Sequence, residues 1–126
     1  LDMYLEVCDF INSRQKTPSI SQQIQNYIDN NYIDADLNVN TLADYFNYAP
    51  SYLSMKYKEE TGESIIDYLY KTRIKHGKEL LETTNLKIYN IATLVGFHDS
   101  NAFIRIFKKL EGITPGSYKK LNLSQQ

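Results

Sequence analysis

The stretch that decides the fold runs from Ile88 to Pro115 and reads IYNIATLVGFHDSNAFIRIFKKLEGITP. Its first part carries apolar residues at helical spacing, namely Ile88, Ile91, Ala92 and Val95. Gly96 predicts the end of this short helix, and Asp99 is placed to cap a second helix running from about Ser100 to Leu110. Two short helices joined by a tight turn that contains glycine are typical of a helix-turn-helix unit.

The second helix of this unit has one apolar face and one polar face. The apolar stripe comprises Phe103, Ile106, Phe107 and Leu110, and Gly112 predicts where the helix ends. On a wheel of about 100° per residue the opposite face carries Asn101, Arg105 and Lys108. Amide, guanidinium and ammonium groups suit hydrogen bonds to base edges and phosphate oxygens. The pattern therefore favours nucleic-acid recognition by this helix.

A longer pattern surrounds this unit and resembles the signature of the AraC/XylS family of bacterial transcription regulators. Its residues hold fixed spacings over about 40 positions: Arg73, Ile74, Gly77, Leu81, Ile91, Ala92, Gly96, Phe97, Phe103, Phe107, Lys108, Lys109, Gly112, Thr114 and Pro115. The resemblance covers roughly Ser19 to Leu121. It implies a DNA-binding domain with two helix-turn-helix units joined by one long helix. It further implies an upstream effector or signal-receiving domain, and contact with RNA polymerase as an activator.

The bulk composition is that of a globular domain. The 126 residues are 42% hydrophobic and 23% charged, with a mean hydropathy of −0.47. No apolar run approaches the roughly 18 residues of a membrane span, and no secretory signal is visible. A single cysteine, Cys8, fits a reducing cytosol, so we expect a cytoplasmic protein. Because the first residue is leucine rather than methionine, we expect the chain to be a piece of a longer protein.

The charge balance is less basic than expected for a DNA-binding domain. The formal net charge is −1 and the isoelectric point about 6.1. Residues 19–61 hold two basic and six acidic residues, a net charge of −4, whereas residues 62–126 hold ten and six, a net charge of +4. The second half is therefore the electropositive one, and phosphate contact depends on local charge. The neutral sum also motivates an alternative, a protein-interaction module with the same fold and weak or no DNA binding.

The first half repeats the pattern of the second. Leu42-Ala43 matches Ile91-Ala92 at an offset of 49 residues, and Tyr57-Lys58 matches Phe107-Lys108 at an offset of 50. Three helices are expected there. The first runs from Ile20 to about Asn31, where an asparagine would serve as a left-handed cap. The second is short and is capped by Asn38, and the third runs from Pro50 to Thr61 and ends before Gly62. Two copies predict two similar binding heads.

One long helix is expected between the heads, from Ser64 to about Thr83. Ser64 and Asp67 resemble a capping box, and about 19 residues of helix span roughly 28 Å. Such a helix is long enough to hold two heads about one DNA turn apart, near 34 Å. Gly77 lies inside it, which suggests close packing against one head. A final helix is expected from Thr114 and Pro115.

The prediction is therefore an all-α fold of about seven helices, with two helix-turn-helix subdomains joined by a linker helix. The expected parts are an upstream tail or linker at 1–18, with a helix or helix remnant over Leu1–Ser13, a first head at 19–62, the linker helix at 63–84, a second head at 85–122 and a polar tail at 123–126. The expected function is sequence-specific binding of double-stranded DNA, with the helices Pro50–Thr61 and Ser100–Leu110 in successive major grooves.

Candidate base-contacting residues lie on the outer faces of these two helices. In the second head they are Ser100, Asn101 and Arg105, where Arg105 offers a bidentate contact to guanine or remains a solvated surface residue. In the first head they are Ser51, Tyr52 and Met55. Met55 stands where many members of the family have arginine, and it either touches thymine methyl groups or contributes little to base recognition. Ala49 provides no cap, and Lys56 replaces apolar Ile106, so we expect weaker base recognition by the first head.

Candidate phosphate-contacting residues are Lys58, Arg73, Lys108 and Lys109, although such charges are commonly only solvated. Catalysis and metal binding have little support in the sequence. His76 and His98 are the only histidines, no ligand cluster surrounds them, and no glycine-rich phosphate loop or nucleophile motif is present. We therefore expect no enzyme activity, no cofactor and no metal.

Overall fold

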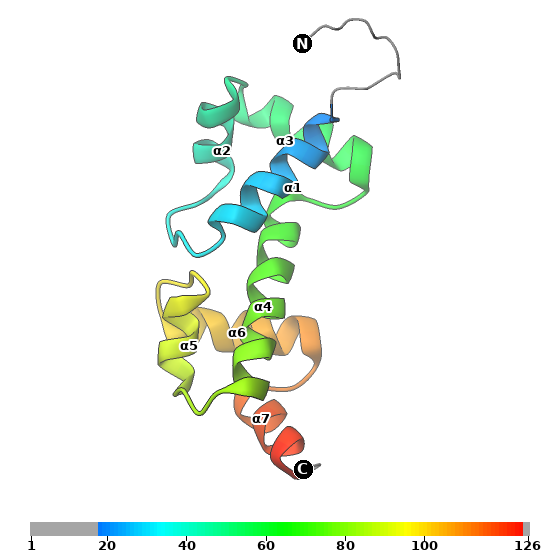
Figure 1. The fold of residues 1–126 in the computed structure, drawn as a ribbon. Coiled ribbons are helices and arrows are strands. Elements are labelled where there is room, and N and C mark those ends of the chain that lie inside the picture. Colours follow the sequence, from blue (N-terminus) through cyan, green and yellow to red (C-terminus); the bar gives the residue numbers. More distant parts are fainter. Residues whose placement is uncertain (1–17, 125–126) are drawn as a thin grey trace, which may run out of the picture.

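The computed structural model describes residues 18–124, and every regular element in this part of the chain is an α-helix (Figure 1). The helices are α1 Ile20–Asn31, α2 Val39–Phe46, α3 Pro50–Thr61, α4 Ile65–Thr83, α5 Ile88–Leu94, α6 Ser100–Glu111 and α7 Pro115–Ser124. The predicted all-α fold, with two helix-turn-helix units on a linker helix, is confirmed. The helix expected within Leu1–Ser13 lies outside the described residues.

Short polar side chains start most of these helices, as the sequence predicts. The Asp99 carboxylate accepts a hydrogen bond from the backbone N–H of Ala102 at 2.8 Å. Asn38 and Thr41 form a reciprocal capping box at the start of α2. Ser64 caps α4, whereas Ala49 makes no side-chain cap for α3. Each of these bonds satisfies a backbone donor that the first turn of a helix leaves unpaired.

Two helix ends differ from the sequence-based expectation. The helix α1 ends where predicted, but its C-cap is Tyr32 in the right-handed conformation, so the left-handed asparagine expected there is wrong. The left-handed asparagine is instead Asn47, which ends α2 with φ of 64°. At the other end of the chain α7 continues to Ser124, so the first two residues of the expected tail are helical.

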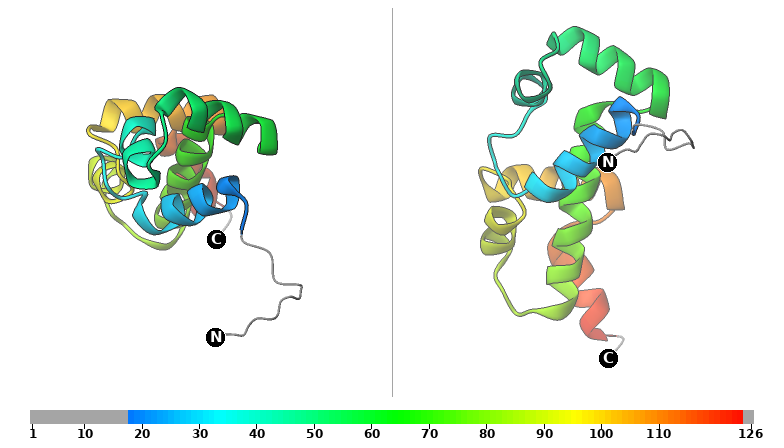
Figure 2. Two further views of the ribbon diagram at one scale, coloured as in Figure 1. Left: turned by 90° about the horizontal axis from the view of Figure 1, so that it is seen from above. Right: turned by 45° about the horizontal axis from the view of Figure 1, so that its top comes forward.

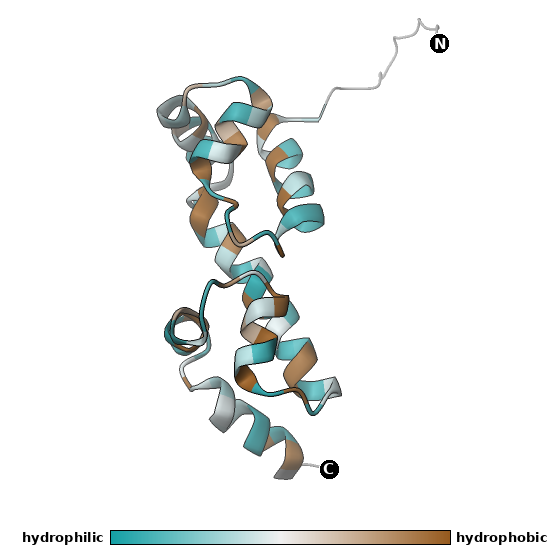
Figure 3. Ribbon diagram, turned by 90° about the vertical axis from the view of Figure 1, so that its left-hand side faces the viewer, coloured by the Kyte–Doolittle hydropathy of each residue, from teal (hydrophilic) through white to brown (hydrophobic). Residues whose placement is uncertain are grey.

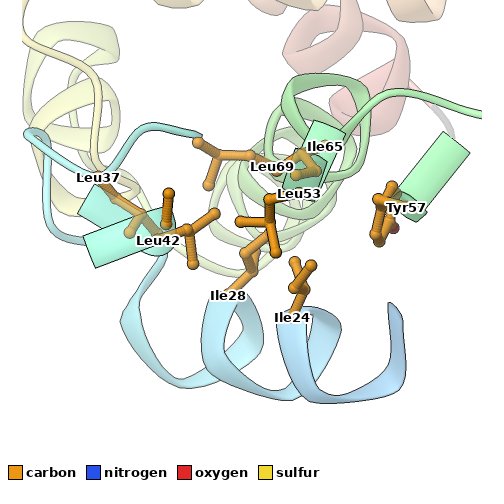
Figure 4. Packing of buried hydrophobic residues seen from close by; sticks show 9 residues of the cluster. Ile24, Ile28, Leu37, Leu42, Leu53, Tyr57, Ile65 and Leu69 are labelled. Atoms are coloured by element: carbon orange, nitrogen blue, oxygen red, sulfur yellow. The ribbon is translucent and has the colours of Figure 1, made fainter. Parts of the chain in front are cut away.

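Two hydrophobic cores form, one in each half of the molecule. The first joins α1, α2, α3 and the start of α4 (Figure 4), and its buried members are Ile24, Ile28, Leu37, Leu42, Ala43, Leu53, Tyr57, Ile65 and Leu69. The second joins the rest of α4 to α5 and α6, and its buried members are Ile74, Leu81, Ile91, Ala92, Val95, Phe97, Phe103, Ile106 and Phe107. Figure 3 shows apolar and polar residues alternating along the helices.

The helix α4 belongs to both cores. Ile65 and Leu69 pack in the first, and Ile74 and Leu81 pack in the second. Gly77 is buried, and a Cβ placed on it would lie 2.8 Å from a ring carbon of Phe103. The predicted close packing of Gly77 against one head is therefore confirmed, and that head is the second. The domain limits at 62/63 and 84/85 stay a prediction.

Candidate nucleic-acid interface

The two candidate recognition helices lie on the same side of the linker helix. Seen from above, α3 and α6 pass on one side of α4, and α1 lies on the other side (Figure 2, left). The first helix of each unit, α2 or α5, packs on the recognition helix that follows it. Two polar helices on one side of a long spacer can face a single extended ligand.

The outer face of α6 is polar and unoccupied by other parts of the described chain. Phe103 and Phe107 are fully buried, which turns Asn101, Arg105 and Lys108 outward, and all three are exposed. Ser100, at the first position of the helix, is half-buried beside the Asp99 cap. Because Asp99 holds the start of α6, these side chains are presented from a fixed helix end.

The exposed cations of both recognition helices are available to bind an anion. Within residues 18–124 the side chains of Lys58, Arg105, Lys108 and Lys109 make no hydrogen bond and no ion pair. Other lysines are engaged: Lys78 pairs with Glu111 at 3.0 Å, and the Lys119 ammonium donates to the backbone oxygen of Thr84 at 2.8 Å. A cation without a protein partner can bind phosphate without breaking an existing contact.

The outer face of α3 is more apolar than that of α6. Leu53 and Tyr57 point into the first core, and Ser51, Tyr52 and Met55 are exposed, Met55 by 50%. The ring of Tyr52 lies 5.3 Å from that of Tyr48, between centroids. This helix therefore offers an aromatic and a thioether surface with Lys58 at its far end.

Lys56 and Ile106 occupy equivalent positions with different surroundings. Ile106 is 4% exposed and packs in the second core. Lys56 is half-buried, and its ammonium lies 3.9 Å from carboxylate oxygens of both Glu59 and Glu60 on the same helix. The ammonium therefore lies near two carboxylates of its own helix and remains partly exposed to solvent, which explains how a charge is tolerated at that place in the repeat.

The structure contradicts the prediction of a phosphate contact for Arg73. This residue is 4% exposed, and its guanidinium donates to the backbone oxygens of Tyr32 and Asp34, each at 2.9 Å. It also lies over the ring of Phe97, 5.5 Å from the centroid. Burial lowers the pKa of Arg73 from its ordinary value, against the opposing influence of Tyr70 and Asp34. Its donors face the protein interior, so no phosphate can reach them in this conformation.

His98 joins the turn of the second head to the first head. Its Nε2 lies 3.3 Å from a carboxylate oxygen of Asp36, and both side chains are largely exposed. The sequence carried no signal for a partner of His98 so far away along the chain. No group of three or more histidine, cysteine or acidic side chains among the described residues is arranged to hold a metal ion.

No helix within residues 18–124 combines the length and apolar character that a membrane span requires.

Comparisons with known proteins agree with this geometry. A family model described as a helix-turn-helix domain matches residues 42–121. The HTH-type transcriptional regulator YijO of Escherichia coli K12 is 36% identical over 121 residues, which make up 93% of this chain and 42% of that protein. The chain thus spans less than half the length of this relative.

Solved structures share the fold. The C-terminal domain of AraT, a response regulator from Geobacillus stearothermophilus, has a TM-score of 0.80 and 34% identity, covering 85% of this chain and 88% of that chain. The DNA-binding domain of AdpA, solved with a target DNA, has a TM-score of 0.79 over 86% of this chain and 97% of that chain. Its identity of 18% makes it a likeness of fold alone.

Proposed function

Because the chain belongs to the AraC/XylS family of helix-turn-helix transcription regulators, we propose that it binds a two-part site on double-stranded DNA, with α3 and α6 in successive major grooves. The observation that carries the proposal is the placement of two exposed helix faces on one side of α4. A helix fits the major groove of B-DNA, and a spacer of about 28 Å allows two such helices to reach neighbouring turns.

Each head has its own role in the proposal. Arg105 makes a bidentate contact to a guanine, and Asn101 contacts a base one turn earlier on α6. Met55 and Tyr52 on α3 supply apolar contact, for instance to thymine methyl groups. Lys58, Lys108 and Lys109 bind phosphates and set the register on the duplex without reading sequence.

The second head is proposed as the principal reader. It lies in the half of the chain that carries a net charge of +4, and α6 presents both Arg105 and Asn101. The first head lies in a segment of net charge −4 and presents one unpaired lysine, Lys58, on α3. Hydrogen bonds to base edges discriminate more strongly than apolar contacts, so the sequence preference should rest mainly on α6.

The family supports further proposals for the whole protein. A regulator of this type is expected in the bacterial cytoplasm, where it meets the chromosome, RNA polymerase and a signal delivered by an effector or receiver domain. We propose the role of activator. In-vitro transcription from a promoter that carries the bound site tests it, because an activator raises transcript yield and a repressor lowers it.

A selection from random-sequence duplexes tests the DNA proposal. The chain should enrich a two-part motif, and Arg105→Ala should lose about 1–3 kcal/mol of binding free energy and relax the preference at one base pair. Lys75→Ala is the matched control, because Lys75 is an exposed cation on α4 without a side-chain partner among the described residues. The alternative, a protein-interaction module motivated by the net charge of −1, predicts no enrichment at all.

A further inference from the structure

The two heads touch each other directly, in addition to being joined by α4. The loop after α1, residues 32–36, belongs to the first head, and the turn before α6, residues 96–99, belongs to the second. Figure 1 shows this loop above the turn between α5 and α6, on the same side of α4. His98 lies beside Asp36, 62 positions earlier, and Gly96 lies beside the backbone oxygen of Tyr32, 64 positions earlier, so α4 alone does not produce the contact.

Arg73 connects this loop to the linker helix. Its Nε donates to the backbone oxygen of Tyr32 and its Nη2 to that of Asp34, both at 2.9 Å. The same guanidinium covers the ring of Phe97, which belongs to the turn of the second head. One buried side chain on α4 therefore holds the backbone of the first head against an aromatic residue of the second.

Gly96 brings the second head to the same backbone oxygen. Its φ is +102°, and a Cβ placed on it would lie 2.2 Å from the oxygen of Tyr32 and 2.9 Å from Nε of Arg73. No side chain fits in that space, because a carbonyl oxygen of the backbone does not move aside cheaply. The absence of a side chain at Gly96 is therefore what allows the two heads to meet.

Tyr32 completes the contact from the side of the first head. Its ring packs against both hydrophobic cores, although it is itself only partly buried. The ring also stacks on the imidazole of His76 in α4, with centroids 4.3 Å apart and planes 7° apart. The loop is thus held by side-chain packing as well as by hydrogen bonds.

We propose that Arg73, Tyr32 and Gly96 form an inter-head clamp that fixes the angle and separation of α3 and α6. Arg73 and Gly96 then act as positioning residues for two-groove binding, without touching DNA. The inference deepens the proposed function and rests on it for its DNA-binding consequence. A single helix can bend and twist between two bodies, whereas a second point of contact removes that freedom.

The clamp predicts a sharp preference for one spacing between the two half-sites. Each added base pair moves a half-site by about 3.4 Å and rotates it by about 34°, because a turn of about 34 Å contains roughly 10 base pairs. Rigid heads cannot follow this change. Loss of simultaneous engagement removes an avidity of roughly 10²–10⁴-fold. Heads that are no longer held together by the clamp should bind both half-sites over a wider range of spacings.

The binding test uses duplexes carrying the two half-sites selected by the wild-type chain, with the spacer lengthened or shortened by one and two base pairs. For Gly96→Ala and the milder Arg73→Lys, the affinity ratio between the best and the altered spacing should fall by on the order of tenfold. Affinity for a single half-site should stay unchanged. A variant that is only less stable lowers all affinities by one factor, so it leaves this ratio as it was.

Gly112→Ala is the matched control. Gly112 also has a positive φ, of +86°, but a Cβ there would meet nothing within 4 Å. Both alanines suffer the same kind of backbone strain, and only the one at position 96 opens the clamp. The proposal would be overturned if Gly96→Ala and Arg73→Lys kept the wild-type affinity ratio between the best and the altered spacing. It would also be overturned if Gly112→Ala lowered this ratio as much as they do.

A second measurement needs no DNA and therefore separates the clamp from the proposed function. Spin labels on Ser54→Cys in α3 and Thr93→Cys in α5, both exposed positions, report the distance between the heads after Cys8→Ser. The wild-type background and Gly112→Ala should give a narrow distance distribution, and Gly96→Ala a broad or shifted one. A narrow, unshifted distribution in Gly96→Ala would show that α4 alone holds the heads, whatever the chain binds.

Discussion

Replacement of Gly77 by alanine tests how tightly the linker helix packs on the second head. In an open helix this change stabilises a protein by about 1 kcal/mol, because glycine loses more backbone freedom on folding. At position 77, however, the new Cβ would lie 2.8 Å and 3.1 Å from two ring carbons of Phe103. That ring has no room to retreat, since Phe97 and Phe107 lie 5.6 Å and 5.7 Å from it between centroids.

The net effect follows from these two opposing contributions. Overpacking of a filled core costs about 1–3 kcal/mol, so Gly77→Ala should lower the free energy of unfolding by about 1 kcal/mol after the helix-propensity gain is subtracted. Gly77→Leu adds three more carbon atoms at the same place and should destabilise further. Gly116→Ala is the matched control, because a Cβ there meets nothing within 4 Å, and it should be neutral or stabilising by up to about 1 kcal/mol.

Urea unfolding followed by far-ultraviolet circular dichroism measures all three variants. The midpoint should fall for both substitutions at Gly77 and stay or rise for Gly116→Ala, with an unchanged dependence on urea concentration. If Gly77→Ala were as stabilising as Gly116→Ala, the linker helix would not be in contact with Phe103, and the packing of α4 on the second core would be wrong.

Three further predictions concern the interface and one tyrosine. Met55→Ala should reduce the discrimination between specific and scrambled duplexes less than Arg105→Ala does, because a thioether offers apolar contact alone. If competition binding showed the larger loss of discrimination for Met55→Ala, α6 would not be the principal reader. Lys108→Ala should weaken binding to all duplexes about equally, and it should reduce the slope of log affinity against log salt concentration, measured from roughly 50 to 200 mM, by about one. A wild-type affinity that does not change with salt concentration would show that the phosphate assignments are wrong. Burial, together with the hydrogen bond that its hydroxyl donates to Asp29, raises the pKa of Tyr68 to about 12. Its stabilising contribution is complete below the unfolded pKa of about 10 and is lost as the pH rises from there through the folded pKa, so wild-type stability should fall more than that of Tyr68→Phe between about pH 10 and 12.

The sequence predicted those features of the fold that depend on nearby residues. Asp99 and Asn38 were identified as caps because a cap bonds to a backbone group only three positions away. The same locality makes the breaks at Gly62 and Gly112 visible, since each ends a periodic apolar stripe. The close approach at Gly77 was also predictable, because glycine inside a helix is unfavourable unless a neighbour needs the space.

Features that depend on distant backbone atoms were not predictable. Arg73 lies between Thr72 and Ile74 on a helix, and an arginine in a helix is most often a surface cation. Its partners are carbonyl oxygens 41 and 39 positions away, and every residue carries such an oxygen, so no side-chain pattern marks them. The end of α1 shows the same limit, because asparagine at positions 30 and 31 matched the pattern of a left-handed cap that the chain places at Asn47 instead.

The exposed candidate residues could be located but not ranked by the structure. The wheel that placed Arg105 and Asn101 outward agrees with the burial of Phe103 and Phe107. The partition into base and phosphate contacts depends on the position of a duplex, which sets the distance from each side chain to a base edge. These roles therefore stay predictions, apart from Arg73, whose burial removes it from the phosphate set.

The spacing of the protected DNA tests the central claim most directly. A hydroxyl-radical footprint of the chain on a duplex recovered by selection should show two protected segments on one face, with centres about 10 base pairs apart, as two helices in successive major grooves require. A single protected segment would contradict the use of both recognition helices, and the absence of any enriched or protected duplex would contradict sequence-specific DNA binding itself.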